Sequence, residues 1–427
     1  MEDNNSCIED VSTFFLWPIK AYKGFTLSSN WKDIDNVSPD HEITKSAPEI
    51  TEYFDSQVLE SVTGNYSIPD ITITYESTAE YPEFHKKWKL IPRLFRMESD
   101  IWILRIEAKP TLNDNENITI AQVLDFNETF RYCDIKSYQK KPDDAARFRF
   151  KACTGDQIIR FGDDDIFIAT GQFLLRILVP EQTPTNGNGF IDMLDVSGIS
   201  QCLDKFDKMI VFSSVVSPDI TPVDLFRLTT VDMHDSHLPT DDYISMSKGA
   251  SLYSRWTDES LGFTGYSMSW VIRDMWRDDM LAKDARMLYG GFLAISLVYQ
   301  LSFLADYSRQ LSKLDADGNQ QEIRDLRKQI LEFTNKSWFS RITYEVQGHE
   351  IYTLWRKEMD LDTLYKELHS ELAETDEYIR MKNEELSKKK TEEISERINK
   401  IQIWGFWIAL VSIIYTLANE VIQYMNK

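Results

Sequence analysis

Hydrophobic residues in the last third of the chain recur with a helical period. Between residues 361 and 401 they lie mostly three, four or seven positions apart, and charged residues fill most positions between them. No Gly or Pro occurs in residues 350–404. We therefore expect an amphipathic stalk helix over residues 359–400, whose apolar stripe needs partners, most simply other copies of the chain. The apolar positions are Leu361, Leu364, Leu368, Leu372, Ile379, Leu386, Ile394, Ile398 and Ile401.

Residues 401–422 have the length and composition of a transmembrane helix. Residues 401–418 carry no formal charge. At 1.5 Å rise per residue the segment would be about 30 Å long, close to the thickness of a hydrocarbon core. Trp404 and Trp407 near one end and Tyr424 near the other are typical of membrane interfaces. We expect the stalk to continue into this helix.

The charges beside residues 401–422 give the segment a direction. Basic residues are concentrated before it, and only Lys427 follows it. The positive-inside rule then predicts a protein of the cell inner membrane with its N-terminal part in the cytoplasm. The alternative is a buried C-terminal helix of a soluble protein, which Glu420 favours because an ionisable group in hydrocarbon is costly. The preceding basic residues are Lys388, Lys389, Lys390, Arg397 and Lys400.

A second apolar stretch, Met287–Ala305, is also long enough to span a membrane. Charges of both signs flank it, so it has no clear sidedness. We interpret it as a buried core helix, with a second membrane span as the alternative.

The first part of the chain is rich in β-branched and aromatic runs separated by turn-forming residues. Helical patterns dominate from Gly249 onward. The fold class expected is an α+β cytosolic domain (residues 1–248), then a helical region (249–358), an amphipathic stalk helix (359–400) and a C-terminal transmembrane helix (401–422). The predicted strands cover residues 70–75, 101–106, 165–169, 173–179 and 209–212.

Composition limits the classes of function. The chain has 427 residues, 47 Lys and Arg against 69 Asp and Glu, and a formal charge of -22. Such an acidic chain argues against direct nucleic-acid binding, which needs a dense basic surface. No nucleophile elbow, phosphate-binding glycine loop or paired-cysteine metal motif is present, so we do not expect an enzyme.

A run of alternating basic residues is the most specific local motif. On a strand, Arg147, Arg149 and Lys151 would share one face. Three cations in a row need an anion or acidic neighbours, and an Arg fork grips phosphate well. The motif predicts either a phosphate-binding site or a structural charge cluster. Asp219 could accept a hydrogen bond from the same ligand, and an Asx turn is the alternative.

A short stretch concentrates potential metal ligands. Asp232, His234, Asp235 and His237 supply two carboxylates and two imidazoles, as a divalent-metal site would. The alternative is a loop that acquired these residues by chance. Mg²⁺ or another divalent cation is the cofactor that this set suggests.

The segment Asn335-Lys-Ser-Trp-Phe-Ser-Arg-Ile-Thr-Tyr-Glu-Val-Gln-Gly-His-Glu-Ile-Tyr-Thr-Leu-Trp355, followed by Leu364-Tyr-Lys-Glu-Leu368 and a long charged helix with an apolar end, resembles divergent CorA-type proteins. The resemblance covers the last third of the chain. It implies a homopentamer with a cytosolic α/β domain, a long stalk helix and a central pore for divalent cations. Family members in type III CRISPR systems are thought to be membrane effectors controlled by a nucleotide second messenger.

The chain departs from the family at the ion filter. Typical members end the first membrane helix with Gly-Met-Asn and add a second membrane helix. At the matching position this sequence reads Tyr415-Thr-Leu-Ala-Asn419-Glu420. Ordinary Mg²⁺ selectivity is therefore not implied, and only Asn419 is carried over. Rings of Asn419 and Glu420 would line a pore and favour cations. Alternatively, both residues mark the membrane surface.

Together these observations predict a CorA-like oligomeric membrane channel or effector. Its cytosolic domain would bind a small anionic ligand of the nucleotide second-messenger class and open or perturb a pore, in antiviral defence. One alternative is a constitutive divalent-cation (Mg²⁺) transporter. Another is a tail-anchored scaffold that conducts nothing.

Overall fold

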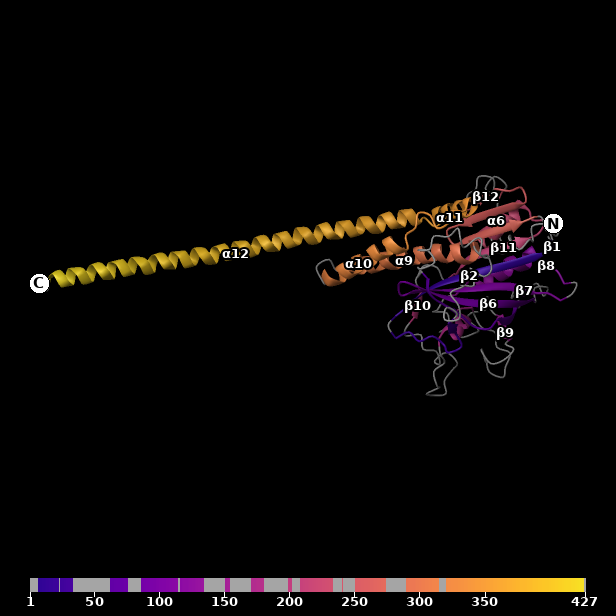
Figure 1. The fold of residues 1–427 in the computed structure, drawn as a ribbon, viewed down its shortest axis with the longest axis horizontal. Helices are drawn as coiled ribbons and strands as arrows, with labels where there is room; N and C mark the ends of the chain where they lie inside the picture. The colour runs from indigo at the N-terminus through magenta and orange to yellow at the C-terminus, as the bar shows by residue number, and fades with distance from the viewer. Residues whose placement is uncertain are drawn as a thin grey trace. The chain divides into compact units, whose positions relative to one another are not determined.

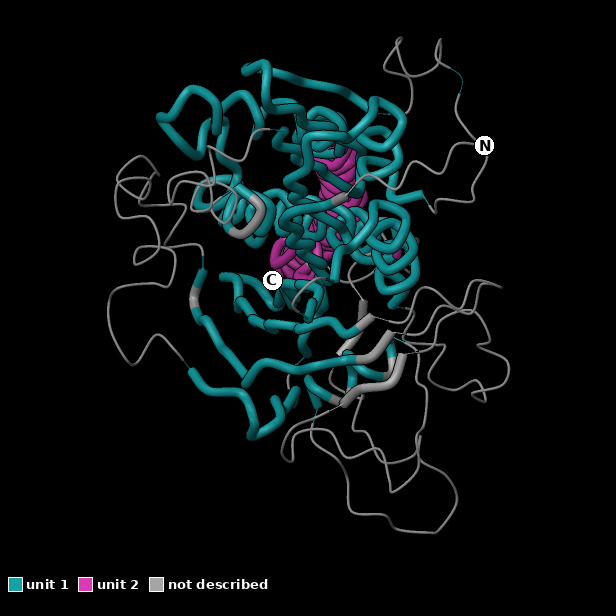
Figure 2. The backbone as a smooth tube through the Cα atoms, turned by 90° about the vertical axis from the view of Figure 1, so that its right-hand side faces the viewer, with its two compact units in different colours: residues 1–312, 328–366 teal, residues 313–327, 367–427 magenta. Residues whose placement is uncertain are grey.

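The structure is a computed structural model of the chain. It describes residues 7–22, 24–33, 62–75, 86–113, 116–133, 150–153, 170–179, 199–201, 208–232, 240, 250–273, 289–314 and 320–425. The chain divides into two compact units (Figure 2). One contains residues 1–312 and 328–366, and the other contains residues 313–327 and 367–427.

The first unit is built on a mixed sheet (Figure 1). The strands follow the order β12-β13-β14-β11-β2-β7-β6-β4-β3, with β10 on β2, β5 on β6 and β9 on β5. Only β11 and β14 pair in parallel among these strands. The bounds are β2 (Asp10–Ala21), β3 (Lys32–Asp33), β4 (Val62–Ser67), β5 (Ile71–Tyr75), β6 (Lys86–Met97), β7 (Ile101–Thr111), β9 (Phe150–Cys153), β10 (Ile199–Gln201), β11 (Ile210–Val216), β12 (Ser251–Tyr253), β13 (Glu259–Thr264) and β14 (Ser267–Ile272); β1 (Cys7–Ile8) and β8 (Ile118–Thr119) pair separately.

The centre of the sheet is buried on both faces. In β2, Phe15 and Trp17 join the main apolar core, while Phe14 on the alternate side stacks on Phe212 at 5.6 Å between ring centroids. A strand with apolar residues on both sides is expected where helices cover both faces. The sheet therefore forms the middle layer of the unit.

Helices from early in the chain cover one face. They are α4 (Ile120–Phe130), α5 (Thr170–Leu178) and α6 (Pro222–Thr230). Phe126 of α4 stacks on Trp88 of β6 with centroids 3.7 Å apart. Asn127 donates a hydrogen bond to Ser213 of β11 at 3.0 Å. α6 comes close to β13 at Gly262, where a Cβ atom would lie 2.0 Å from the hydroxyl oxygen of Thr229.

Later helices cover the other face. These are the π-helix η5 (Tyr289–Leu293), α9 (Ala294–Lys313) and α11 (Val346–Glu358). Lys20 of β2 forms an ion pair with Asp306 of α9 at 2.6 Å. Tyr289 stacks on Trp270 of β14 at 5.5 Å, and Ser251 of β12 donates a hydrogen bond to Glu358 of α11 at 2.6 Å. The unit is thus a helix–sheet–helix sandwich.

The second apolar stretch is part of this sandwich. Most side chains of α9 in residues 294–307 are buried, and Phe303 stacks on Phe333 of α10 (Gln320–Lys336) at 3.8 Å. The prediction of a buried core helix is confirmed for the described residues 289–305. Apolar length alone cannot separate a core helix from a membrane span, and burial decides between them here.

Several predicted strands are confirmed. Those at 70–75, 101–106 and 209–212 correspond to β5, β7 and β11, while the strand at 165–169 lies outside the described residues. The prediction of a strand over 173–179 is wrong, because residues 170–178 form α5. Phe173, Leu174 and Leu175 are all fully buried. A short helix buried on most sides has a continuous apolar run like that of a buried strand.

The expectation that helices dominate from Gly249 onward is wrong for β12–β14. These strands continue the sheet from β11, across the predicted boundary at residue 248. Ser267 and Ser269 of β14 face α6, where Ser269 lies 2.5 Å from the Thr229 hydroxyl oxygen. Serines at a tight helix–sheet contact hide the alternation of apolar and polar residues that marks a strand.

The last helix confirms the expected continuity of stalk and membrane segment. α12 runs from Leu361 to Met425 without interruption. Met359 and Asp360 separate it from α11. Asp360 has a φ of 53°, in the left-handed region, which breaks the helical path between the two helices. The fold shown is thus an α+β region with a mixed sheet, followed by helices that end in a long apolar helix.

Candidate functional site

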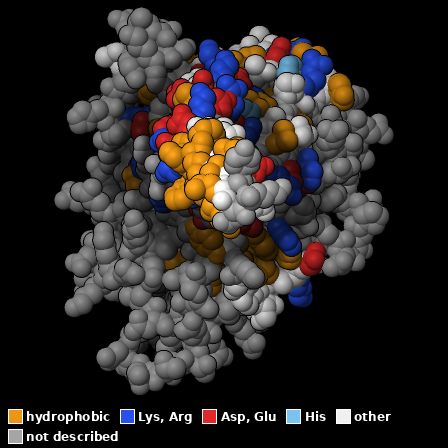
Figure 3. Space-filling view, turned by 90° about the vertical axis from the view of Figure 1, so that its left-hand side faces the viewer, with side chains coloured by type: hydrophobic (Ala, Val, Ile, Leu, Met, Phe, Trp, Pro, Cys, Tyr) orange, Lys and Arg blue, Asp and Glu red, His pale blue; other side chains and the backbone are white. Residues whose placement is uncertain are grey.

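The C-terminal part of α12 is exposed and strongly apolar. Among the described residues, α12 is the one helix whose length and composition are sufficient to cross a membrane, and its apolar window is not buried. Viewed from the C-terminal end, apolar side chains dominate the described surface of this helix (Figure 3). An apolar surface of this kind in water would be an aggregation hazard, and a bilayer would cover it.

Small and polar residues follow a single line along this segment. They lie alternately three and four residues apart, so they share one face of the helix. The other residues from 401 to 422 are large and apolar or aromatic, apart from Ala418 and Glu420. We call this line the polar stripe. It consists of Gln402, Gly405, Ala409, Ser412, Thr416, Asn419 and Gln423.

Before the membrane segment, the line of the polar stripe is not apolar. The same alternating steps lead back from Gln402 to Ile398, Ser395, Thr391 and Lys388. Closer to the start of α12, Leu361, Leu368 and Leu372 are buried. The polar stripe is therefore set apart by the large apolar residues on the other sides of the helix, which begin at residue 401.

Both predicted pore residues lie in this helix. Asn419 belongs to the polar stripe, and Glu420 lies beside the stripe, four residues after Thr416. Both are exposed in the single chain. The rest of the stripe was not predicted, although the regular steps of three and four residues in the sequence could have revealed it.

The predicted basic strand is only partly described. Arg147 and Arg149 lie outside the described residues, whereas Lys151 lies in β9 opposite Thr74 of β5. Asp219 is exposed in the turn after β11. β2, β7, β6 and β5 lie between β11 and β9 in the sheet. The structure therefore does not bring Lys151 and Asp219 together.

The turn at Asp219 has its own hydrogen bond. The backbone N–H of Asp219 donates to the hydroxyl oxygen of Ser217 at 3.4 Å. The side chain that accepts a hydrogen bond from the turn is thus that of Ser217. This is the pattern of a Ser turn, which uses the backbone N–H of Asp219 and not its carboxylate.

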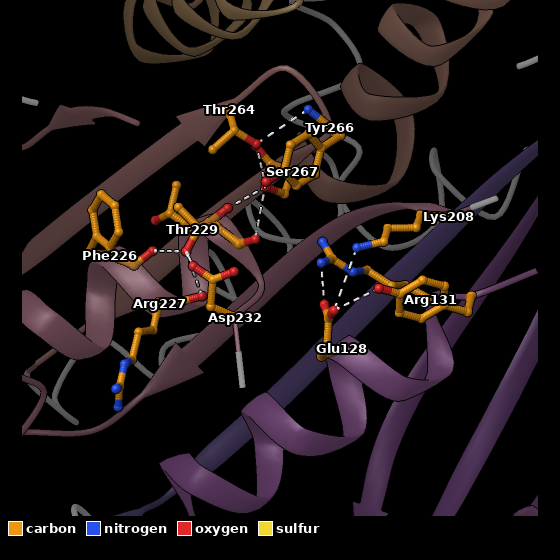
Figure 4. A network of polar contacts seen from close by, with 12 residues as sticks. Glu128, Arg131, Lys208, Phe226, Arg227, Thr229, Asp232, Thr264, Tyr266 and Ser267 are labelled. Atoms are coloured by element: carbon orange, nitrogen blue, oxygen red, sulfur yellow. Dashed lines mark hydrogen bonds and ion pairs between the residues drawn. The ribbon is translucent and has the colours of Figure 1, made fainter. Parts of the chain in front are cut away.

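Of the predicted metal ligands, only Asp232 is described; His234, Asp235 and His237 lie outside the described residues. Asp232 follows α6, and its carboxylate accepts a hydrogen bond from Thr230 at 2.6 Å (Figure 4). Within the described part of the chain, no three His, Cys, Asp or Glu side chains are grouped as metal ligands.

A charged cluster lies at the end of α4 (Figure 4). The Glu128 carboxylate pairs with Arg131, lies 3.5 Å from the Lys208 amino group and accepts a hydrogen bond from Tyr132 at 3.0 Å. Arg131 also packs over the ring of Tyr266, with 5.5 Å from its guanidinium to the ring centroid. These contacts join α4 to the start of β11 and to the β13–β14 turn.

Burial raises the pKa of Glu128, although the positive charges of Arg131 and Lys208 oppose the shift. The negative charge of Asp232 adds to the rise in this pKa. Glu128 therefore loses its proton at a higher pH than an exposed glutamate does. This arrangement ties three elements together, and its acceptor is already occupied by three donors, as in a structural cluster.

Arg356 of α11 holds the first turn of α12. Its guanidinium donates to Asp362 in the first turn of α12 at 3.1 and 2.7 Å, and to the hydroxyl of Tyr352 at 2.7 Å. It also donates to the carbonyl of Phe339 and lies 4.0 Å above the Trp338 ring. These contacts hold the first turn of α12 against α11 and the residues before it.

Comparisons with protein-family models, curated proteins and solved structures find no match to this chain. Its function is therefore argued from its own residues.

Proposed function

We propose that the chain is a self-assembling protein of the cell inner membrane, with its N-terminal unit in the cytoplasm. Several copies of α12 would form a bundle whose inner surface is the polar stripe. A small anionic ligand of the nucleotide class, bound by the cytoplasmic unit, would open or perturb a pore along that surface. The single line of small and polar residues on an otherwise apolar helix supports this proposal most directly.

The physical reason is that water and lipid require opposite inner faces. In water, a helix bundle hides apolar side chains such as Ile394 and Ile398. In lipid, it hides small and polar residues such as Ser412 and Asn419, which let helices approach and form hydrogen bonds between them. Such bonds stabilise a membrane bundle by roughly 0.6–2 kcal/mol each. α12 carries small and polar residues of this kind on one face from Gln402 to Gln423, where its other sides are almost entirely apolar.

The same bundle would give Glu420 suitable surroundings. In a single helix its carboxylate would face hydrocarbon or the headgroups, which is costly. Beside a water-filled lumen, a ring of Glu420 with Asn419 would attract cations. The resemblance to CorA-type proteins favours five copies around this lumen and conduction of Mg²⁺ or another divalent cation. Asp232 and its three neighbouring candidates remain a proposed metal site of the cytoplasmic unit.

Ligand control would act as a population shift. A ligand that binds one arrangement of the cytoplasmic units better than another favours that arrangement. The contacts of Arg356 with Asp362 and Tyr352 then offer a rigid route into α12. The resemblance to CRISPR-associated members of the CorA superfamily suggests antiviral defence as the setting.

Cross-linking tests the inner face. In a chain without its four native cysteines, Ser412→Cys places a thiol on the stripe, and Ile414→Cys places one on nearly the opposite side. In liposomes, we expect Ser412→Cys alone to form interchain disulfides and to react with a water-soluble thiol reagent. Equal behaviour of both variants, or cross-linking of Ile414→Cys alone, would contradict the proposal.

Ion flux separates the alternatives. Liposomes that carry the protein should release cations only when nucleotide is added on the side of the N-terminal unit. Flux of Mg²⁺ without nucleotide would favour the constitutive transporter. Cross-linking through Ser412→Cys without any flux would favour a non-conducting scaffold.

A further inference from the structure

Lysine and threonine residues from four neighbouring strands come into register at one end of the sheet. One row across β7, β6, β5 and β9 is Thr111, Lys87, Thr74 and Lys151. The next row is Lys109, Lys89, Thr72 and Cys153. We call these two rows the Lys–Thr face. Residues two apart on a strand share a face, so the rows lie on the same side of the sheet.

The exposure of β6 shows which side this is. Trp88 and Leu90 are buried in the main core, whereas Lys87 and Lys89 on the alternate side are exposed. Across the strand pair, the side chain of Lys109 is 44% exposed and that of Lys89 is 49% exposed. The described lysines of the Lys–Thr face are thus open to solvent, on the side of the sheet opposite the main core.

Among the side chains that the structure describes, the face carries three lysines and two acidic partners. Lys89 and Lys109 lie directly opposite each other, a pairing that like charges disfavour. Lys89 pairs with Asp70 at 2.7 Å, and Lys109 pairs with Glu107 at 2.6 Å. Among the described residues, Lys87 has no acidic partner. Lys151 adds a fourth lysine at its register position.

On the same side of the sheet, β6 and β7 carry a second pair of like charges. Arg93 of β6 lies opposite Arg105 of β7. Arg105 is buried and packs over the rings of Phe14 and Phe95, at 5.6 and 5.3 Å. In a chain with a net charge of -22, this concentration of cations on two adjacent strands is not explained by composition.

We propose that the Lys–Thr face binds the phosphate groups of a small ligand that carries at least two of them. Lysine ammonium groups and threonine hydroxyls both donate hydrogen bonds to phosphate oxygens. At about 4.8 Å between strands, the face extends about 10 Å from β7 to β5, and its two rows lie about 7 Å apart. Two phosphates joined by a few bonds can engage lysines of both rows, whereas one phosphate reaches only adjacent lysines.

This inference deepens the proposed function, on which it rests, by giving the ligand a site and a chemical class. The backbone of β9, which carries Lys151, pairs with β5 beside this face, with Lys151 opposite Thr74 in register. The site is on the flat of the sheet, away from Asp219, which follows the end of β11.

Titration calorimetry on the full-length protein in detergent tests the site, with pyrophosphate, ATP and inorganic phosphate as probes. The variant is Lys87→Ala with Lys89→Ala. The control is Lys328→Ala with Lys388→Ala, which removes two exposed lysines elsewhere. We expect the first pair to weaken pyrophosphate and ATP binding about tenfold or more, equivalent to about 1.4 kcal/mol. The control should bind as the wild type does, and inorganic phosphate should bind weakest of the three probes.

Three outcomes would overturn the inference: wild-type affinity in the Lys87→Ala and Lys89→Ala variant, equal weakening in the control, or no binding of pyrophosphate or ATP by the wild type. Ser412→Cys cross-linking in the same background separates this failure from failure of the proposed assembly. If cross-linking persists while the phosphate probes do not bind, the assembly stands and the site is wrong. An unchanged unfolding temperature shows that the lysine variants are folded.

Discussion

The attachment of α12 to the folded unit should depend far more on Arg356 than on its ionic partner. Arg356 is 8% exposed, so its hydrogen bonds to the Phe339 carbonyl and the Tyr352 hydroxyl are shielded from water. Asp362, by contrast, is 63% exposed at its side chain. The two sides of one guanidinium therefore lie in very different dielectric surroundings.

The magnitudes follow from this difference. A hydrogen bond from a charged donor contributes roughly 1.5–3 kcal/mol, and a desolvated contact between a cation and a ring contributes up to about 2 kcal/mol. Release of the guanidinium from burial offsets part of that sum. We expect Arg356→Met, which keeps the apolar packing, to lower the free energy of unfolding by about 3 kcal/mol. Asp362→Asn breaks an exposed ion pair and should cost less than about 1 kcal/mol.

Urea unfolding of the full-length protein in detergent, followed by tryptophan fluorescence, measures both variants. Trp338 lies against the guanidinium and Tyr365, so it should report the loss of this packing directly. Equal destabilisation by Arg356→Met and Asp362→Asn would show that the exposed ion pair dominates. A loss below about 1 kcal/mol for Arg356→Met would refute the reasoning from burial.

Two further predictions concern the sheet and its charged cluster. Gly262→Ala should destabilise the protein by about 1–3 kcal/mol, because the new Cβ would overlap Thr229. Adding Thr229→Ala should recover part of this loss in urea unfolding. If the losses of the two single variants simply added in the double variant, the contact would be contradicted. Glu128 has a raised pKa in the folded protein, so its contribution to stability is present below its ordinary pKa of 4.5 and is lost as pH rises through the raised value. Glu128→Gln should therefore flatten the fall of the urea midpoint with pH above 4.5, and parallel slopes in wild type and variant would argue against the shift.

Elements with a strong periodic signal could be predicted from sequence. The charged positions between Leu361 and Ile401 leave only one helical face apolar, so the stalk and its continuation into α12 were predictable. β5, β7 and β11 were predictable from their β-branched and aromatic residues. These signals are local, because each depends on neighbours within a few turns or one strand.

Elements whose character depends on tertiary contacts were missed. Residues 170–178 form a helix, although the run from Phe173 to Val179, interrupted only by Arg176, resembles a buried strand. In β14, Ser267 and Ser269 take positions where a strand pattern would place apolar residues, because both contact Thr229 of α6. The Lys–Thr face could not be predicted, because Lys87, Lys89 and Lys109 become neighbours only through the register of β6 and β7.

The polar stripe shows why hydrophobicity alone misleads at the end of this chain. A search for apolar residues identifies residues 401–422 as a span and treats Ser412, Thr416 and Asn419 as imperfections in it. If the span were a simple lipid anchor, nothing would keep those residues on one line, since every side would face the same hydrocarbon. Their alignment on one side of α12 instead indicates that this side faces other helices rather than lipid. The inner side of α12 within the membrane is therefore defined by its contrast with the surrounding hydrocarbon, because small and polar residues gain from contact with one another and lose from contact with lipid.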